Sequence, residues 1–300
     1  MPRTKTALSK PTTRAPHTAT RAPRVSVLTP IYNTNPAHLR EMIESILMQT
    51  FTDFEFLILN DSPNNKEIEK IVLDYAKHDK RVKYAKNEKN MGITPSRNKL
   101  LKMARGEYLA IFDHDDISVP DRLEQEVAYL DTHPHIGVVS GWLQYFGNDN
   151  SIWKTPEFDT DIRIMLCHSC YIAHTAAMIR KSVLTDNNIE YEEFYTPAED
   201  YRLWTRLMDV THFYNLQMVL VKYRWMGGNT SNIYSSRTES ARRAIQIDVC
   251  DKHPGLYSIS QMYAPGTRFR LRLFGIPLIK IKNNKVYLFE FIPVLKMLWR

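Results

Sequence analysis

Glu107-Tyr-Leu-Ala-Ile-Phe-Asp-His-Asp-Asp116 is an apolar run that leads directly into three carboxylates within four positions. The apolar part predicts a strand buried on both faces, as in the parallel sheets of α/β proteins. Such sheets bind their ligands at the carboxyl ends of the strands, where Asp113, Asp115 and Asp116 would lie. The simpler alternative is a solvated acidic turn before a helix, because Asp is common at helix starts.

Three carboxylates so close together repel one another unless a bound cation neutralises them. Side chains i and i+2 of a strand point the same way, so Asp113 and Asp115 can converge on one hard cation, with Asp116 beside them. Oxygen ligands select Mn²⁺ or Mg²⁺, and Mg²⁺ typically takes one or two protein carboxylates together with phosphate oxygens. The sequence therefore predicts a Mn²⁺ or Mg²⁺ site that works with a phosphate-bearing ligand.

The net charge of +7 comes from the two ends of the chain. Residues 1–24 carry +6 and residues 267–300 carry +7, whereas residues 25–266 carry −6. The acidic body lacks the basic, aromatic-rich face that nucleic-acid binding requires, so we expect no nucleic-acid partner. Two basic ends suit peripheral contact with an anionic membrane, although solvated tails that keep the protein soluble explain them equally well.

The cysteines Cys167, Cys170 and Cys250 are too few for a disulfide framework and suit a reducing compartment. The Cys167–Cys170 spacing with His174 nearby would allow a zinc site. No second paired motif accompanies it, so small buried residues on a packed segment are the favoured interpretation. No stretch has the roughly 20 apolar residues that span a bilayer, and residues 1–24 lack the apolar region of a secretory signal. We therefore expect a cytoplasmic protein, with peripheral contact at the inner face of the cytoplasmic membrane as an open alternative.

From Val25 onward, strand and helix patterns alternate. Repeated βα units of this kind specify an α/β fold with a mostly parallel sheet and helices on both faces. After Thr132 the pattern becomes mixed. The sequence predicts strands over 25–29, 54–59, 82–85 and 107–112, then a strand over 136–146, a helix or loop over 157–166, a strand-like stretch over 171–180, a helix over 199–208, a strand over 218–224 and a last helix over 236–252 that Pro254-Gly255 closes.

The same patterns divide the chain into three parts. Residues 1–24 read as a disordered basic tail, and residues 25–235 as a globular domain with a nucleotide-binding half (25–132) and an acceptor half (133–235). Residues 236–300 read as a helix followed by a basic, apolar extension. In that extension Lys282-Asn-Asn-Lys285 separates two apolar runs, which suggests a β-hairpin. The hairpin would sit in a membrane interface or cover an apolar patch of the body.

Four further strings belong with the acidic cluster. The first three lie at or just after the carboxyl end of a predicted strand, so a doubly wound sheet gathers them with the cluster in one crevice. They are Thr29-Pro-Ile-Tyr-Asn33, Asp61, Asn90-Met-Gly-Ile-Thr-Pro-Ser-Arg-Asn98 and, farther along, Ala198-Glu-Asp-Tyr-Arg-Leu-Trp204.

Over residues 25 to 232 these strings together resemble the family 2 glycosyltransferases of the Rossmann-like GT-A fold, of the bacterial surface-polysaccharide or lipopolysaccharide type. The resemblance implies that Asp200 is the catalytic base and that Asp113 and Asp115 hold the metal. A helix-terminal charge pair is the alternative for Glu199-Asp200, and a structural role is the alternative for His174. The resemblance places the nucleotide against Thr29, Pro30, Tyr32, Asp61, Arg97, Asp113 and His114, and we expect the acceptor near Glu199, Arg202 and His174.

The predicted activity is inverting transfer of a hexose from a UDP-sugar to a hydroxyl of a lipopolysaccharide or surface-polysaccharide acceptor. A metal neutralises the departing diphosphate, and a carboxylate takes the proton of the acceptor hydroxyl. A dTDP-sugar donor, such as one carrying rhamnose, and a non-catalytic sugar-nucleotide or carbohydrate-binding module are the alternatives. A nicotinamide dehydrogenase is disfavoured because Thr29-Pro-Ile-Tyr32 stands where a Gly-x-Gly-x-x-Gly turn should be.

The chain departs from the family's pattern at two places. Asn60-Asp-Ser-Pro63 stands where Asp-Asp-Gly-Ser is frequent, and Met226 stands where a His often follows the aromatic residue. Without that His, the alternative contacts to phosphate are Arg224, Asn229 and Ser231.

Overall fold

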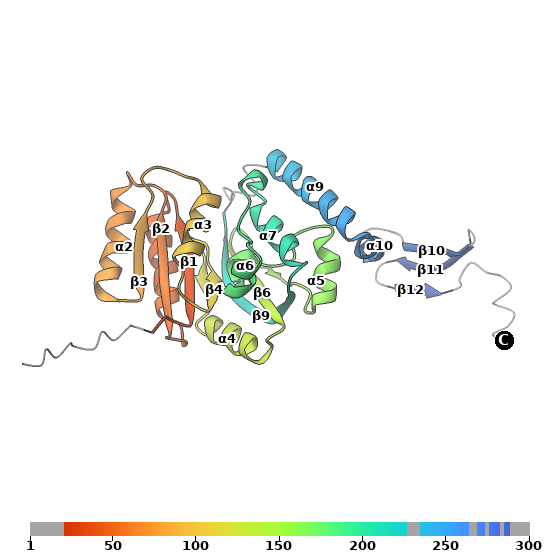
Figure 1. The fold of residues 1–300 in the computed structure, drawn as a ribbon, viewed down its shortest axis with the longest axis horizontal. Coiled ribbons are helices and arrows are strands. Elements are labelled where there is room, and N and C mark those ends of the chain that lie inside the picture. The colour runs from red at the N-terminus through yellow and green to blue at the C-terminus, as the bar shows by residue number, and fades with distance from the viewer. Residues whose placement is uncertain (1–20, 227–234, 264–268, 274–275, 283–284, 289–300) are drawn as a thin grey trace, which may run out of the picture.

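The computed structural model describes residues 21–226, 235–263, 269–273, 276–282 and 285–288. One long sheet runs through the body, with helices against both of its faces (Figure 1). Its strand order is β3-β2-β1-β4-β8-β6-β9-β5, with β7 paired to β6. The first four strands are parallel, as are β6 and β9, whereas β8 is antiparallel to both β4 and β6. The predicted α/β fold with a mostly parallel sheet is therefore confirmed.

The first half of the sheet is a run of βα units. Strands β1 and β2 are buried at every position, which explains their continuous apolar sequences. Two helices start at Asn caps, where the side-chain oxygens of Asn35 and Asn65 accept hydrogen bonds from the backbone N–H groups of Ala37 and Ile68. The elements are β1 (Val25–Ile31), α1 (Pro36–Leu47), β2 (Phe54–Asn60), α2 (Lys66–His78), β3 (Val82–Lys86), α3 (Ile93–Met103) and β4 (Tyr108–Ile111).

The second half is built around a long parallel pair of strands, β6 and β9, which are in register from their first residues to their last apart from local shifts. The elements are β5 (Ile117–Ser118), α4 (Arg122–Thr132), β6 (Ile136–Gly147), β7 (Ile152–Trp153), α5 (Asp159–Leu166), the 3-10 helix η1 (His174–Ala176), β8 (Met178–Arg180), α6 (Lys181–Asp186), the 3-10 helix η2 (Glu193–Tyr195), α7 (Glu199–Leu207), β9 (His212–Trp225) and α9 (Ser235–Lys252).

Two local predictions are wrong. The stretch 171–180 is not one strand, because η1 occupies its middle and only Met178–Arg180 pairs with the sheet. The helix predicted over 236–252 is present as α9 and ends at Lys252, but it is not the last helix, because a further one, α10 (Pro254–Tyr263), begins at Pro254. Proline lacks the N–H that the first turn of a helix leaves unpaired, so it starts a helix as readily as it stops one.

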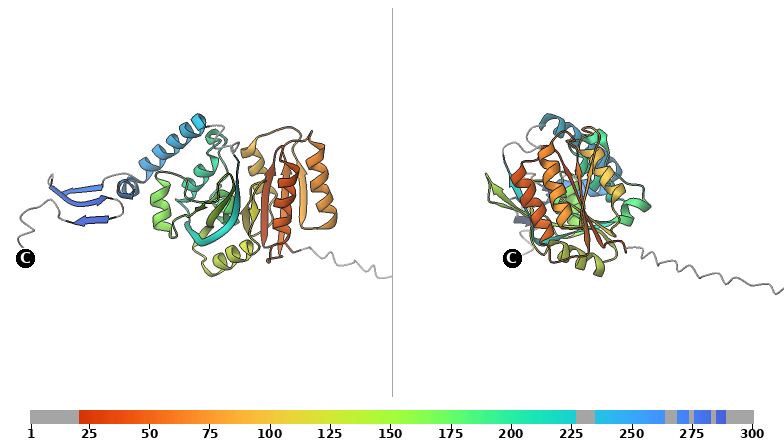
Figure 2. Two further views of the ribbon diagram at one scale, coloured as in Figure 1. Left: turned by 180° about the vertical axis from the view of Figure 1, so that it is seen from behind. Right: turned by 90° about the vertical axis from the view of Figure 1, so that its left-hand side faces the viewer.

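The core consists of two apolar layers, one on each face of the sheet. Side chains of α1, α2 and α4 belong to one layer, and side chains of α3, α5, α7 and α9 belong to the other. Figure 2 shows the helices on the two sides of the twisted sheet. Because the helices cover the two faces of the sheet, the carboxyl ends of its parallel strands β1, β2 and β4 lie at an edge that these helices do not cover.

The C-terminal strands β10 (Phe269–Leu273), β11 (Ile276–Lys282) and β12 (Lys285–Leu288) form a separate antiparallel sheet beyond α10 (Figure 1). Lys282 pairs with Lys285 across the predicted Asn-Asn turn, which confirms the hairpin, and β10 adds a strand that was not predicted. Residues 1–20 of the predicted tail and 289–300 of the predicted extension lie outside the described residues. The division into domains stays a prediction.

The described residues hold no helix long and apolar enough to cross a membrane. They also hold no group of three or more His, Cys, Asp or Glu side chains that could bind a metal by themselves, so the suggested zinc site does not form there. Cys167, Cys170 and Cys250 are free, and the ring of His168 instead contacts the backbone oxygen of Ser260 at 2.9 Å.

Arg122 and Glu126 form a fully buried ion pair on α4, with Nε and Oε2 3.1 Å apart. Arg122 Nη2 also donates to the backbone oxygen of Ile111, at the end of β4, at 2.9 Å, and lies 3.4 Å from that of Ala177. This guanidinium therefore ties the end of β4 to the segment that precedes β8.

Arg122→Met is expected to lower the free energy of unfolding by about 3–5 kcal/mol, because it leaves the Glu126 carboxylate buried without a counter-charge. The double variant with Glu126→Leu should be more stable than the single variant, since no charge is then left buried. Urea denaturation of both variants tests this. A single variant that loses less than about 1 kcal/mol would show that the pair is not needed.

Candidate active site

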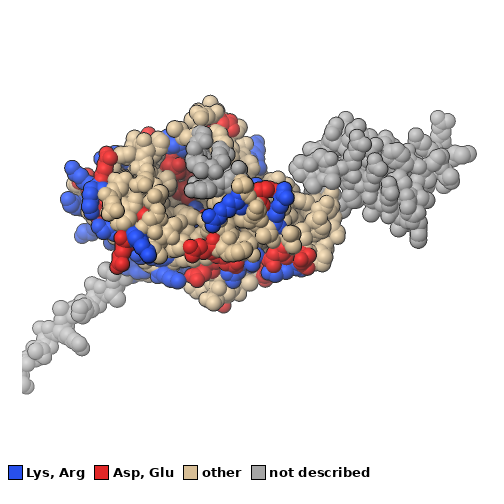
Figure 3. Space-filling view, turned by 90° about the horizontal axis from the view of Figure 1, so that it is seen from above, with Lys and Arg blue, Asp and Glu red and all other residues tan. Residues whose placement is uncertain are grey.

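The ends of β1, β2 and β4 meet at one edge of the sheet because these three strands are parallel neighbours. In the view onto this edge, acidic atoms line a hollow near the middle of the molecule (Figure 3). The segment of η1 joins them there: the backbone N–H of Asp113 donates to Thr175 Oγ1 at 3.1 Å. The predicted crevice at the carboxyl edge is thus present in the fold.

Arg97, on α3, connects the acidic turn to the start of α7. Its Nη2 lies 3.2 Å from Asp113 Oδ1, and its Nη1 lies 2.5 Å from Glu199 Oε1. Arg97 Nε and Glu199 Oε2 are buried without a hydrogen-bond partner among the described residues. Buried polar atoms are normally paired, so these two atoms are candidates to contact a bound ligand.

The carboxylates of this cluster are in two different electrostatic states. Burial raises the pKa of Asp113, but the neighbouring groups together, first among them the Arg97 guanidinium, lower it below its ordinary value, so Asp113 is held ionised. Burial, followed by the nearby charge of Glu199, raises the pKa of Asp200 to about 6. Among the described residues, the one hydrogen bond to Asp200 Oδ1 comes from its neighbour's backbone, the Tyr201 N–H, at 2.6 Å. Asp200 is therefore a carboxylate that can take up a proton near neutral pH.

Arg224, on β9, holds the acidic turn in place. Its backbone N–H donates to Asp116 Oδ1 at 2.9 Å, its Nε donates to the backbone oxygen of Asp115 at 2.8 Å, and its Nη2 lies 2.5 Å from Glu41 of α1. Asp116 is fully buried, and burial together with the charge of Asp115 raises its pKa well above the usual range. The side chain of Asp115 is 34% exposed, so its carboxylate remains accessible.

His114, between the two predicted metal ligands, has its Nδ1 3.9 Å from Asp115 Oδ1. His174 is buried and its Nε2 contacts the hydroxyl of Tyr191 at 2.9 Å. Burial and then the charge of Arg97 lower the pKa of His174 to about 3, so its ring is neutral. The structure thus brings His174 beside the cluster as a packed side chain, and its predicted contact with an acceptor stays a prediction.

Asp61 lies at the same edge, but its carboxylate is occupied by the loop after β3. Oδ1 accepts from Asn87 Nδ2 at 2.7 Å and from the Met91 N–H at 2.8 Å, and Oδ2 accepts from the Gly92 N–H at 2.8 Å. Gly92 has φ +88°, a backbone conformation that favours glycine. Asp61 therefore fixes the loop that leads into α3 and Arg97, and its contact with the nucleobase stays a prediction.

The residues at the end of β1 divide into buried and exposed positions. Thr29 and Pro30 are buried in the strand, and Thr29 Oγ1 has no hydrogen-bond partner among the described residues. Tyr32 follows the strand and is 49% exposed, so its ring is open to a ligand at this edge. The next residue is held in place because the Asn33 N–H donates to Ser62 Oγ at 3.1 Å.

Arg202 is not brought to the cluster. Its guanidinium pairs with Glu192 at 3.1 Å and with Asp248 of α9 at 2.5 Å, and it lies over the ring of Tyr195. The structure adds instead residues that the sequence did not single out, Glu41 and His38 of α1. Burial and the charge of Arg224 lower the pKa of His38, which places its ring near that guanidinium. In the sequence, Glu41 and His38 look like ordinary surface residues of a helix, so no motif pointed to a role at the site. Asn229 and Ser231, the suggested alternative contacts to phosphate, lie outside the described residues.

The donor set fits a hard cation bound together with a diphosphate. The described side chains form no complete cage, whereas Asp115 offers an accessible carboxylate and Asp113 an ionised one shared with Arg97. A cation of the Mg²⁺ class keeps several non-protein ligands and needs only one or two carboxylates. Asp113 and Asp115 are therefore suitable ligands for Mn²⁺ or Mg²⁺.

The fold is that of solved GT-A glycosyltransferases. The *S. aureus* protein TarS, residues 1–349 in complex with UDP, superposes with a TM-score of 0.58 at 19% identity, over 84% of this chain and 76% of that one. The mannosyltransferase PcManGT from *Pyrobaculum calidifontis*, in complex with GDP-Man and Mn²⁺, superposes with a TM-score of 0.59 at 16% identity, over 82% and 71%. At these identities the likeness concerns the fold alone.

The sequence comparisons define the family. The model of glycosyl transferase family 2 matches residues 26–187, more than half of the chain. The uncharacterized glycosyltransferase MJ1057 of *Methanocaldococcus jannaschii* is 35% identical over 209 residues, which cover 67% of this chain and 71% of that protein. The chain belongs to glycosyltransferase family 2, and it is a glycosyltransferase.

Proposed function

We propose that the protein is an inverting hexosyltransferase that transfers a sugar from a UDP-sugar to a hydroxyl of a lipopolysaccharide or surface-polysaccharide acceptor. The observation that carries the proposal is the Arg97 bridge, which joins ionised Asp113 to the Glu199-Asp200 pair. This bridge supports the proposal because Asp113 would serve the donor side and Asp200, next to Glu199, would accept the proton of the acceptor hydroxyl. The UDP donor and the type of acceptor rest on the resemblance of the sequence motifs to the family.

On the donor side, the chain would supply carboxylates for the metal and a surface for the nucleobase. Asp113 and Asp115 would hold Mn²⁺ or Mg²⁺, which when bound neutralises charge that develops on the departing diphosphate. Tyr32 would lie against the nucleobase. Asp61 would contribute to the nucleobase site through the loop that it holds in place. Arg97 would approach the diphosphate with Nε, which has no hydrogen-bond partner in the part of the chain that the structure describes. PcManGT binds Mn²⁺ with its nucleotide-sugar, which supports a metal here.

On the acceptor side, Asp200 would act as the general base. The acceptor oxygen forms a bond to the anomeric carbon as the bond from that carbon to the diphosphate oxygen breaks, and the hydroxyl proton passes to Asp200. A single displacement of this kind inverts the anomeric configuration. Glu199 is less suitable as the base because its carboxylate is buried against Arg97.

The donor can be tested by thermal shift with UDP, dTDP, GDP and CMP, each with and without Mn²⁺. We expect UDP with Mn²⁺ to stabilise the protein most, because the resemblance to the family implies a UDP-sugar donor. A ligand at one hundred times its Kd contributes about 2.7 kcal/mol to the free energy of unfolding. A larger shift with dTDP or GDP would replace the UDP assignment. If no nucleotide stabilises the protein with Mn²⁺, the acidic cluster is not its donor site.

The pH dependence of turnover tests the role of Asp200. A general base works only when it is unprotonated, so kcat should fall about tenfold per pH unit below a pKa of about 6 and level off above it. The measurement is kcat at saturating donor, acceptor and Mn²⁺ across this range, with unfolding monitored at each pH. A profile that stays flat well below pH 6 would contradict the assignment.

A further inference from the structure

The charge of the body is not evenly distributed. Residues 66–105 contain 12 Lys and Arg against five Asp and Glu, a net charge of +7. The flanking segments 25–65 and 106–266 carry −4 and −9. The acidic body therefore contains one strongly basic block, formed by α2, β3, the loop after β3, and α3.

Most of the cations in this block are exposed lysines at one end of the sheet, where β3 is the edge strand. Figure 3 shows blue side chains gathered at this end of the molecule. Glu69 pairs with Lys66 at 2.9 Å and with Lys86 at 2.8 Å, which neutralises part of the block. Six exposed lysines of the block have no ion-pair partner among the described residues. One of them, Lys99, donates to Asn87 Oδ1 at 2.9 Å. We call the other five the lysine face: Lys70, Lys77, Lys80, Lys83 and Lys89.

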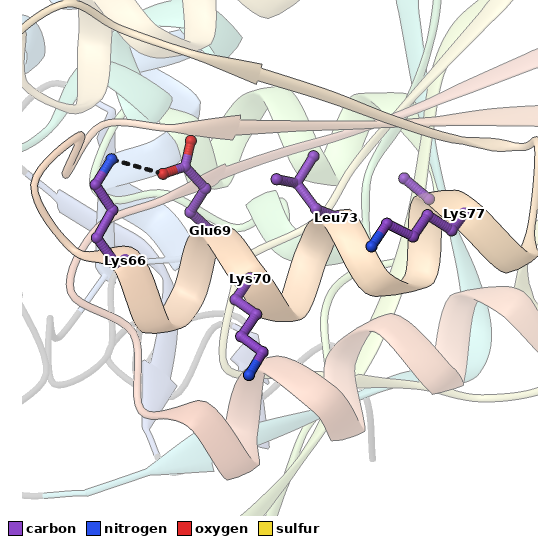
Figure 4. Close-up of a pocket in the computed structure, with 6 residues that line it drawn as sticks. Lys66, Glu69, Lys70, Leu73 and Lys77 are labelled. Atoms are coloured by element: carbon purple, nitrogen blue, oxygen red, sulfur yellow. Dashed lines mark hydrogen bonds and ion pairs between the residues drawn. The ribbon is translucent and has the colours of Figure 1, made fainter.

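Apolar side chains lie among these cations. Leu73 is 40% exposed on α2 and lines a shallow groove together with Lys66, Lys70 and Lys77 (Figure 4). Met91 is similarly exposed, two residues after Lys89 in the loop held by Asp61. Exposed apolar side chains surrounded by lysines are typical of surfaces that rest on a lipid interface.

We propose that the lysine face is a docking surface for an anionic lipid membrane. Each lysine near such a surface is attracted by the negative potential of the lipid headgroups, without specific geometry. The cations of the face are all Lys, whereas recognition of one particular phosphate group would favour the bidentate geometry of Arg. The exposed Leu73 would gain from insertion into the interface, which a hydrated soluble polyanion does not offer.

Docking at this end also has a consequence for the active site. Lys89 and Met91 belong to the loop whose N–H groups bind Asp61 at the carboxyl edge of the sheet. The membrane would therefore lie next to the edge that holds the candidate active site. This surface is separate from the basic ends of the chain, and the inference does not depend on the identity of the donor.

The test is co-sedimentation of the full chain with vesicles that contain phosphatidylglycerol or only phosphatidylcholine. The variant Lys70→Gln/Lys77→Gln/Lys80→Gln should bind the anionic vesicles roughly a hundredfold more weakly, about fivefold for each lysine. The matched control Lys154→Gln/Lys222→Gln/Arg237→Gln removes the same charge from exposed positions elsewhere and should bind like the unaltered chain. Equal binding by the two triple variants would overturn the proposal.

A second pair of measurements separates a membrane from a soluble polyanion. Leu73→Asn removes an exposed apolar side chain and should weaken binding to anionic vesicles but not to dextran sulfate. If Leu73→Asn binds vesicles normally, and the lysine variant loses both ligands equally, then a hydrated polyanion is the partner and the membrane proposal is wrong. All the altered side chains are exposed, so we expect each variant to fold normally. Thermal unfolding of each variant checks this.

Discussion

Asp200→Asn is expected to lower kcat by roughly 10²–10⁴-fold, the range that general base catalysis contributes. The amide has nearly the shape of the carboxylate but cannot take the proton of the acceptor hydroxyl. Affinity for the nucleotide should be preserved, because Asp113 and Arg97 form their own ion pair. The measurement compares single-turnover transfer rates with the Kd for UDP in the presence of Mn²⁺.

The control for this variant is Asp186→Asn, which makes the same chemical change at an exposed position on α6. It should leave both the rate and the affinity unchanged. If Asp200→Asn loses nucleotide binding together with transfer, then Asp200 supports the structure of the cluster and is not the base. If the variant keeps its rate, another group accepts the proton.

Asp115→Asn is expected to reduce kcat/KM by roughly 10²–10³-fold, similar to the loss of one group that stabilises transition-state charge. Asp115 carries the most accessible carboxylate of the acidic turn, whereas Asp116 is buried and Asp113 is shared with Arg97. Its loss should also raise the Mn²⁺ concentration needed for half-maximal activity. A titration with Mn²⁺ measures both effects.

The matched variant Asp161→Asn lies on the exposed side of α5 and should titrate like the unaltered enzyme. Unchanged activity of Asp115→Asn at every Mn²⁺ concentration would remove Asp115 from the metal site. A loss that more Mn²⁺ fully restores would instead show that Asp115 contributes to metal affinity alone.

The parts of the fold that were predictable are those fixed by local sequence. Continuous apolar runs marked β1, β2 and β4, and the polar residues that follow each run lie at one edge because parallel strands share their direction. The Asn-Asn turn likewise marked a hairpin. The helix α10 was missed because a proline that starts a helix and one that stops it look the same locally.

The pairings within the site were not predictable, because they join residues far apart in the chain. Arg97 meets Glu199 across 102 positions, and Arg224 meets Glu41 across 183. No periodicity or local motif encodes such contacts, which depend on how the two halves of the sheet pack. The orientation of Asp61 toward the loop at Met91 and Gly92 depends in the same way on the course of the chain after β3.

The lysines of β3 have one more consequence, which follows from the position of that strand. An edge strand presents unpaired backbone N–H and C=O groups, and these can recruit a strand from another molecule. Lys83 and Lys86 are exposed on β3, so a second strand that approached this edge would have to bring its own backbone close to their charges. The same side chains therefore protect the sheet against edge-to-edge aggregation, and neutralising them would make this end of the molecule prone to self-association.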